Sequence, residues 1–352
     1  MTMAWCALQV QASEANVADD IGLVGREDEL GKLADALASA ASGQPRVVLV
    51  TGPAGIGKST LLAAALRSWK GDVVAGSGDE DEAHVEFALL EHLLRAAPGD
   101  VQPPEPGTEP FRAARTLLEL LEAAEPGRPL ALVVDDAGWG DLPSLQAIAF
   151  ATRRLRAEPV ALLVACRDET LPRLPAGLVR RAESHGVRIE LAGLDADGIA
   201  ALAERAYGRP LPGWAAARLR DHTGGNPLHA TSLVREVPFE RMAAPGQLPA
   251  PRSFAVLVAT RLAACSGDAQ RLLAALAVLG REAPLQAAAR VAGVSDPLAA
   301  ADELQRQRLA ELSEGGPDQA LRFAHDLVHA SVLADLAPAE RKRLNAAAAE
   351  VT

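Results

Sequence analysis

The stretch "RVVLVTGPAGIGKST", residues 46–60, runs from a short apolar segment through a glycine-rich turn into a segment that favours a helix. The pattern GxxxxGK[ST] is met there by Gly52, Gly57, Lys58 and Ser59. In this strand-to-helix context the glycines let backbone N–H groups converge on phosphate oxygens, and the helix N-terminus favours negative charge. The stretch therefore predicts a phosphate-binding loop rather than an ordinary glycine-rich turn.

The loop residues have separate expected roles. Lys58 is expected to neutralise the β and γ phosphates, and the Ser59 hydroxyl is expected to bind Mg²⁺. ATP or ADP is favoured over a guanine nucleotide because no NKxD-type tetrapeptide follows. The expected nucleotide-binding residues of the loop are Gly52, Pro53, Ala54, Gly55, Ile56, Gly57, Lys58, Ser59 and Thr60.

Two further apolar runs end in charged residues. "LALVVDDAGWGD" ends in Asp135, expected to hold Mg²⁺ beside Ser59, and Asp136, expected to orient or deprotonate the attacking water. A helix cap or a solvated loop is the alternative for Asp136. "PVALLVACR" ends in Arg167, which could contact the γ phosphate or form a surface ion pair with Asp168 or Glu169. Lys58, Asp136 and Arg167 are thus the candidate catalytic residues.

Short apolar runs alternate with helical segments over the first half of the chain. This alternation predicts an α/β fold with a parallel sheet covered on both faces. After "LAGLDADGIAALAERA" the strand signals nearly stop, and a hairpin is expected only around "LAELSEGGPDQALRFAH", with Gly315 and Gly316 in its turn. The expected domains are an irregular segment 1–21, a P-loop ATPase domain 22–192, a helical lid 193–245, and a winged-helix-like domain 246–352 that ends in the start of a further helical region.

The composition excludes several classes of protein. The 46 acidic residues against 35 Lys and Arg, a formal charge of -11, argue against a dominant nucleic-acid surface. Cys6, Cys166 and Cys265 lack disulfide or metal-ligand spacing, which favours a reducing compartment. The N-terminus lacks the positive region of a secretory signal, and the apolar runs are too short to span a membrane. A cytoplasmic location without membrane contact is therefore expected.

The ordered motifs "LVGREDEL", "GPAGIGKST", "LALVVDDAGWGD", "LLVACRDE" and "TGGNPLHATSLVRE" resemble the nucleotide-binding region of STAND ATPases. The resemblance is greatest to large LuxR-type bacterial transcriptional regulators and covers residues 22–352. It implies a P-loop NTPase fold of the ASCE/AAA-like class. It also implies that Val24, Gly25 and Arg26 lie near the adenine. Arg167 would be a sensor on the strand between the P-loop strand and the Walker B strand, which is the one that ends in Asp135.

The same resemblance assigns two regions beyond the sheet. Gly225, Asn226 and Pro227 would close the helical domain over the nucleotide, with Pro227 near the base or ribose; read alone, "TGGNP" is a turn that ends a helix. The C-terminal third is similar to a winged helix, but "DPLAAADELQRQRLAEL" is close to charge-balanced, so direct DNA binding is not expected. His325 and His329 could hold a metal, although packing or capping is favoured.

Two departures from the family bear on function. Gly138 stands where relatives carry His or Gln, so slow hydrolysis is expected. The family's superhelical repeats and C-terminal helix-turn-helix are absent, so the chain is expected to be a fragment or a truncated relative. The favoured function is a slowly hydrolysing ATP switch in signal transduction, with an unidentified effector and ATP-dependent self-association.

Two alternatives to the switch stay open. One is an AAA+-like ATPase that works on a protein or nucleic-acid partner, with Arg153 or Arg154 as a weak candidate for an arginine finger. The other is a nucleotide-binding scaffold that does not hydrolyse.

Overall fold

The computed structural model describes residues 22–98, 101–105, 107–125, 127–313 and 319–350. The chain divides into two compact units between Gly193 and Leu194. The expected irregular segment 1–21, Cys6 and the glycines of the expected hairpin turn, Gly315 and Gly316, lie outside the described residues.

The first unit is built on a parallel sheet of five strands in the order β2-β3-β4-β1-β5. The strands are β1 (Arg46–Thr51), β2 (Asp72–Ser77), β3 (Leu130–Asp135), β4 (Val160–Cys166) and β5 (Val187–Glu190). The expectation of an α/β fold with a parallel sheet is confirmed. Because parallel strands end on the same edge, this order brings the ends of β1, β3 and β4 together.

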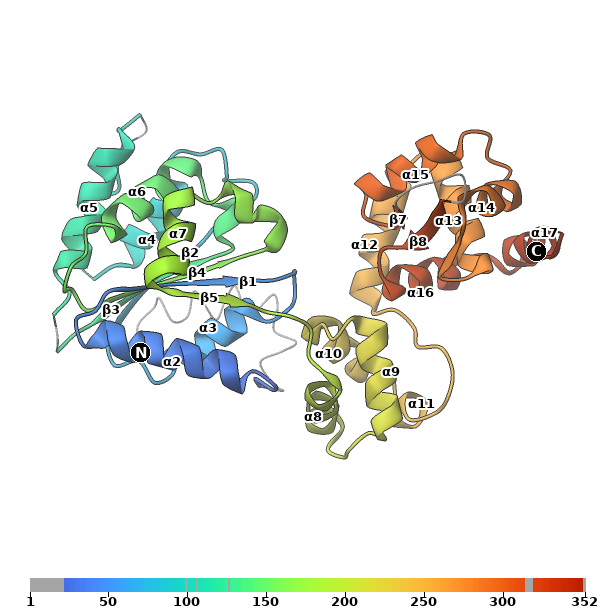
Figure 1. Ribbon diagram of the computed structural model, residues 1–352, viewed down its shortest axis with the longest axis horizontal. Helices are drawn as coiled ribbons and strands as arrows, with labels where there is room; N and C mark the ends of the chain where they lie inside the picture. The colour runs from blue at the N-terminus through green and yellow to red at the C-terminus, as the bar shows by residue number, and fades with distance from the viewer. Residues whose placement is uncertain (1–21, 99–100, 106, 126, 314–318, 351–352) are drawn as a thin grey trace. The chain divides into compact units, whose positions relative to one another are not determined.

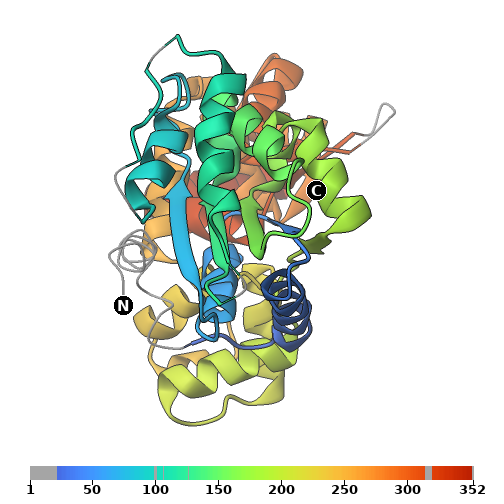
Figure 2. The same ribbon diagram turned by 90° about the vertical axis from the view of Figure 1, so that its left-hand side faces the viewer.

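Helices cover both faces of this sheet, as Figures 1 and 2 show. Val48 and Val50 pack into one apolar cluster with α2 and α3, whereas Val47 and Leu49 pack into the other, with α4 to α7. Alternate residues of a strand point to opposite faces, so each strand must be apolar throughout. The helices of this unit are α2 (Glu27–Ala41), α3 (Lys58–Leu66), α4 (Ala88–Ala96), α5 (Pro110–Glu122), α6 (Leu142–Thr152) and α7 (Ala176–His185), with short 3₁₀ helices η1 (Ala137–Trp139) and η2 (Asp168–Arg173).

The second unit is mainly helical. Its first helices are α8 (Ala196–Tyr207), α9 (Gly213–Thr223), α10 (Pro227–Glu236) and α11 (Phe239–Met242). They are followed by α12 (Arg252–Ala263), α13 (Gly267–Leu279), α14 (Leu285–Ala292), α15 (Pro297–Arg306), α16 (Asp326–Asp335) and α17 (Pro338–Ala349). Within the described ranges, none of the helices combines the length and apolar composition that a membrane span requires.

A small antiparallel sheet lies among the later helices, in the order β6-β8-β7. Its strands are β6 (Glu282–Pro284), β7 (Ala310–Leu312) and β8 (Ala320–Phe323). Leu312 pairs with Leu321 and Ala310 with Phe323, so β7 and β8 form the expected hairpin pairing. The finer identification of this region as a winged helix stays a prediction.

The turn "TGGNP" joins α9 to α10. α9 ends at Thr223, and Gly224 follows in the left-handed region with φ 62°. Asn226 then begins the next helix, because its side-chain oxygen accepts a hydrogen bond from the Leu228 N–H at 3.0 Å. Pro227 occupies the first turn of α10, where its missing N–H costs nothing. The turn interpretation of this motif is therefore seen in the structure.

Candidate nucleotide site

The glycine-rich loop connects the end of β1 to the start of α3, at the carboxyl edge of the sheet. Gly57 lies directly before α3 with φ 98° and ψ 24°, a conformation that residues with a side chain rarely adopt. Gly52 and Gly55 also have positive φ, at 149° and 73°. The loop can therefore curve back over the helix N-terminus, which is the geometry that presents backbone N–H groups to an anion.

Lys58 is buried at the first position of α3. Its ammonium donates hydrogen bonds to the Gly52 and Pro53 carbonyls, both at 2.9 Å. Burial lowers the pKa of Lys58, while the nearby Asp136 and Asp135 raise it. The amine thus spans the loop that it belongs to, and phosphate oxygens would offer it stronger acceptors than carbonyls.

Asp135, at the end of β3, forms a side-chain hydrogen bond with Ser59. Burial raises the pKa of Asp135, and the bond from Ser59 opposes this change. A hydroxyl and a carboxylate in contact are the oxygen ligands that Mg²⁺ takes from proteins. The two residues that the sequence assigns to Mg²⁺ are therefore brought together, and they fit the ion.

Asp136 has a strained backbone, with φ 40° and ψ 41° in the left-handed region. Such a conformation costs a non-glycine residue about 1–2 kcal/mol, and it is often found at functional sites. Asp136 stands before η1, but its side chain makes no capping hydrogen bond there. It forms an ion pair with Arg167 instead, at 3.5 Å between Nε and Oδ1. The Asp136 side chain therefore does not act as a helix cap, which was the alternative role for this residue.

Arg167 directly follows β4, and β4 lies between β1 and β3 in the sheet. This position places the guanidinium between the glycine-rich loop and the acidic pair. Sequence reasoning considered Asp168 and Glu169 as partners and missed Asp136, because the pairing depends on strand order. About a third of each side chain in the Arg167–Asp136 pair is exposed, so the pair can exchange partners with a bound anion.

Gly138 packs directly against η2. A Cβ atom at this position would lie 1.9 Å from the Thr170 hydroxyl, so no larger residue fits. Thr170 is buried, and its hydroxyl donates to the Arg167 carbonyl at 3.1 Å. The space that a polar side chain at position 138 would need is thus filled by a residue that also holds the backbone of Arg167. Beside the Gly138–Thr170 contact, the Arg173 guanidinium lies 4.5 Å from the centre of the Trp139 ring.

Sequence reasoning missed a buried carboxylate next to the site. Asp141 is 2% exposed and accepts hydrogen bonds from the N–H groups of Phe87 at 2.9 Å, Leu89 at 3.1 Å and Ser144 at 2.9 Å. It therefore caps α6 and also the distant start of α4. The signal in the sequence was Asp141 followed by Leu142 and Pro143, because an aspartate cap with a proline in the first turn is typical of a helix start. The second helix could not be foreseen from that pattern.

Residues 24–26 lie beside the loop. Val24 is buried, and Gly25 has φ 61°. The buried Arg26 donates to the carbonyls of Ala192 at 2.5 Å and Ile56 at 3.5 Å. Arg26 thus ties the start of α2 to the loop and to the chain after β5. The expected contact of these three residues with adenine stays a prediction, as does that of Pro227, which belongs to the second unit.

His325 and His329 have structural partners. The Nδ1 atom of His325 accepts from the Leu327 N–H at 3.0 Å and so caps α16. His329 Nε2 lies 3.1 Å from the Ala277 carbonyl. No group of three or more His, Cys, Asp or Glu side chains in the described part of the chain is arranged to hold a metal ion.

Comparison with known families supports the nucleotide interpretation. Residues 22–165 match the family described as "AAA ATPase domain". The match includes the loop, the acidic pair and β4 as far as Ala165, and it stops two residues before Arg167. No curated protein matches the chain.

Solved structures share the fold at low sequence identity. The ORC2 protein of Aeropyrum pernix, solved in ADPNP–ADP complexes, has a TM-score of 0.53 at 13% identity, covering 94% of each chain. The ORC1 protein of Aeropyrum pernix in complex with DNA has a TM-score of 0.51 at 18% identity, covering 89% of this chain and 93% of that one. The first unit of this chain therefore has the P-loop NTPase fold.

Proposed function

We propose that the chain binds Mg-ATP at the carboxyl edge of its five-stranded sheet and hydrolyses it slowly. The observation that carries this proposal is the convergence of Lys58, the Ser59–Asp135 pair and the Asp136–Arg167 pair around one glycine-rich loop. The match to an AAA ATPase domain supports it. A phosphate-binding loop without acidic residues beside it would support binding but no hydrolysis.

The residues act as follows when nucleotide binds. Lys58 exchanges its two loop carbonyls for phosphate oxygens, which are stronger acceptors for a buried ammonium group. Ser59 and Asp135 hold Mg²⁺, which neutralises phosphate charge. The loop N–H groups and the start of α3 bind the remaining oxygens.

The Asp136–Arg167 pair links nucleotide state to hydrolysis. A γ phosphate competes with Asp136 for the guanidinium, so ATP but not ADP separates the pair. Asp136 is then free to accept a hydrogen bond from the attacking water. No polar side chain at position 138 assists it, because Thr170 fills that space. Slow turnover follows from this arrangement.

Two outputs of such an ATPase are compatible with the site. The first is a signalling switch of the LuxR-type regulator kind, in which the nucleotide state controls the arrangement of the domains. Its support is the combination of "VGRE" before the loop and "GGNP" after the sheet. Differential contacts to the γ phosphate through Lys58 and Arg167 would supply the energy.

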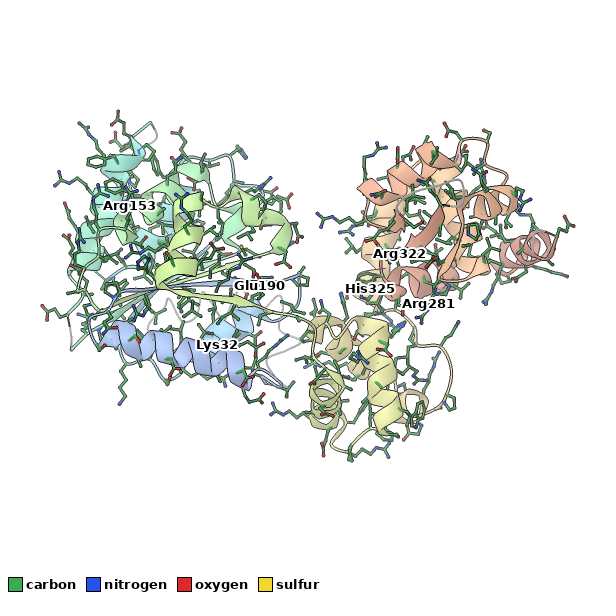
Figure 3. All side chains as sticks on the ribbon, in the orientation of Figure 1. Lys32, Arg153, Glu190, Arg281, Arg322 and His325 are labelled. Atoms are coloured by element: carbon green, nitrogen blue, oxygen red, sulfur yellow. The ribbon has the colours of Figure 1, made fainter. Side chains whose placement is uncertain are left out.

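The second output is an AAA+-like ATPase that works on a partner, and the comparisons favour it over the switch. It predicts fast, partner-stimulated turnover and an arginine supplied by a neighbouring subunit. Arg153 and Arg154 follow α6, and Figure 3 labels Arg153. The Arg154 guanidinium lies 3.2 Å from the Phe150 ring centre, which leaves Arg153, at 6.0 Å, the freer candidate.

Direct DNA binding is not part of the proposal. The ORC1 structure was solved with DNA, but the acidic balance of this chain disfavours a phosphate-backbone surface. A gel-shift assay with residues 1–352 should show no sequence-specific, salt-sensitive complex. Such a complex would contradict this part of the proposal.

A single-turnover experiment tests the proposal and separates the two outputs. The purified chain is mixed with labelled ATP and Mg²⁺, and the nucleotide that stays bound is identified. Slow conversion with retained ADP supports the switch. Fast multiple turnover with free exchange would contradict the slow hydrolysis proposed here and support work on a partner, and bound ATP that is never converted would contradict hydrolysis in both.

A further inference from the structure

The second unit contains a cleft separate from the nucleotide site. It has a volume of about 720 Å³ and lies between α9 with the segment 246–249 on one side and α16 with α17 on the other. This volume is in the range of pockets that hold drug-sized molecules. Figure 3 labels Arg281, one of its lining residues.

The lining of this cleft carries excess positive charge. Its four guanidinium groups belong to Arg218, Arg241, Arg281 and Arg341, and its two carboxylates to Asp221 and Asp326. Four against two leaves an excess of two positive charges in a chain whose formal charge is -11. Like charges gathered around one cleft repel each other, so an anion placed among them is stabilised.

The pairing within the lining increases this imbalance. Arg281 pairs with Asp326 at 2.8 Å, and Asp221 pairs at 3.0 Å with Arg220, which does not line the cleft. Neither Arg241 nor Arg341 forms an ion pair with any residue that the structure describes. Both side chains are exposed, from α11 and α17 respectively. Two guanidinium groups of the lining are therefore available to a ligand.

Arg218 is held in place by the backbone. It donates hydrogen bonds to the carbonyls of Met242 at 2.6 Å, Ala244 at 2.7 Å and Gly246 at 2.9 Å. Its guanidinium lies 5.2 Å from the centre of the Trp214 ring. Trp214 lines the cleft and is 50% exposed, which is unusual for so large an apolar side chain. One wall thus presents an aromatic surface fixed beside a positive charge.

The rest of the lining is largely apolar. Its small and branched side chains are Ala217, Leu248, Ala330, Leu333 and Ala334. The two histidines of the lining are already engaged with carbonyls, His222 with Pro249 at 2.9 Å and His329 with Ala277 at 3.1 Å. An apolar interior with a few convergent charged groups is the usual composition of a small-molecule site.

We propose that this cleft binds a small aromatic organic anion, a mono- or bicyclic ring bearing a carboxylate. The ring would stack on Trp214 and contact the apolar lining, and the carboxylate would lie between Arg241 and Arg341. This binding site does not depend on the proposed ATPase function. Because the ligand touches α9 and α16 at once, its binding also stabilises the association of these two helices.

Isothermal titration calorimetry of the full chain with 2-naphthoate tests the proposal. Saturable binding is expected, and neutral 2-naphthamide, of nearly the same shape, should bind at least fivefold more weakly. The affinity for 2-naphthoate should also fall as salt is raised, because the charges are partly exposed. Equal affinity for the two probes would overturn the assignment of an anion site.

Two variants locate the binding. Arg241→Gln combined with Arg341→Gln should weaken 2-naphthoate binding about tenfold, whereas Arg343→Gln, on α17 but outside the lining, should change it less than twofold. Trp214→Ala should weaken both probes, and circular dichroism checks that each variant is folded. An unchanged affinity in the double variant, or no saturable binding by the wild type, would contradict the proposal.

Discussion

The two compact units differ in the polar side chains that they bury. In the first unit the buried side chains with a formal charge are Arg26, Lys58 and Asp141, among the residues that the structure describes. In the second unit the buried polar side chains are His222, Thr223, Asn226, Thr231 and Ser331. Burial lowers the pKa of His222, which favours its neutral form. Among the described residues, buried side chains with a formal charge thus occur in the first unit and not in the second.

This difference indicates where the chemistry lies. Burying a charge costs free energy unless strong partners compensate, so a fold keeps such groups where function requires them or where several hydrogen bonds hold them. Lys58 belongs to the first class, because its ammonium donates its hydrogen bonds to the loop's own carbonyls and lies near the acidic pair Asp135 and Asp136 of the site. Arg26 and Asp141 belong to the second, because they hold the frame around the loop. The second unit provides neutral packing and exposed arginines.

The largest expected effect concerns Asp136. If it orients the attacking water, Asp136→Asn should lower the single-turnover rate by about 10²- to 10⁴-fold and leave ATP trapped on the chain. Asp168→Asn, an exposed carboxylate directly after Arg167, serves as the control and should keep the wild-type rate. Unchanged turnover in Asp136→Asn would remove the catalytic assignment and make its strained backbone a purely structural feature.

Asp141 tests whether buried charge holds the first unit together. Asp141→Ala leaves three buried N–H groups without their acceptor, so it should lower the free energy of unfolding of this unit by about 3 kcal/mol or more. Asp195→Ala removes one exposed helix cap from the second unit and should cost about 1 kcal/mol. Denaturant titration followed by hydrogen exchange assigns each loss to its unit. Similar costs in the two variants would break the contrast between the units.

The Gly138–Thr170 contact gives a smaller expected effect. Gly138→Gln forces a side chain into the space of Thr170 and should destabilise the first unit by about 1–3 kcal/mol. Adding Thr170→Gly frees that space and should recover part of the stability. A double variant no more stable than Gly138→Gln alone, measured by thermal unfolding, would show that the two positions are not coupled.

A further expected effect is the acid sensitivity of the second unit. Burial lowers the pKa of His229 from 6.5 to about 4, and the neighbouring His325 adds to this. The unfolded chain therefore binds the proton more tightly, and the stability that neutral His229 provides is present above pH 6.5 and lost as the pH falls towards 4. The loss amounts to about 3 kcal/mol.

A substitution checks this linkage. His229→Phe should flatten the dependence of the unfolding free energy on pH between 6.5 and 4, whereas His84→Phe, at an exposed position of the first unit, should not. An unchanged pH dependence in His229→Phe would assign the acid sensitivity to other groups.

The sequence predicts the parts of the site that depend on local patterns. The loop at residues 52–60, the strands before Asp135 and Arg167, and the turn at 223–227 all follow from residue spacing, and the structure has these elements where expected. It could not predict contacts fixed by strand order and helix packing. Asp141 meets an N–H group 54 positions earlier in the chain, and Arg167 meets Asp136 because β4 lies beside β3. The arginine-lined cleft is equally non-local, because its lining extends from residue 214 to residue 341.

Nucleotide binding to the chain and to its Lys58→Ala variant tests the central claim most directly. Isothermal titration calorimetry with ATP and Mg²⁺ should give saturable one-to-one binding to the wild type. Lys32→Ala, an exposed lysine of α2 labelled in Figure 3, should bind like the wild type. Lys58→Ala should lose at least about 100-fold in affinity, or about 2.7 kcal/mol, because a buried charge contact to phosphate is removed. Equal binding by all three proteins, or no binding by the wild type, would contradict the assignment of the nucleotide site.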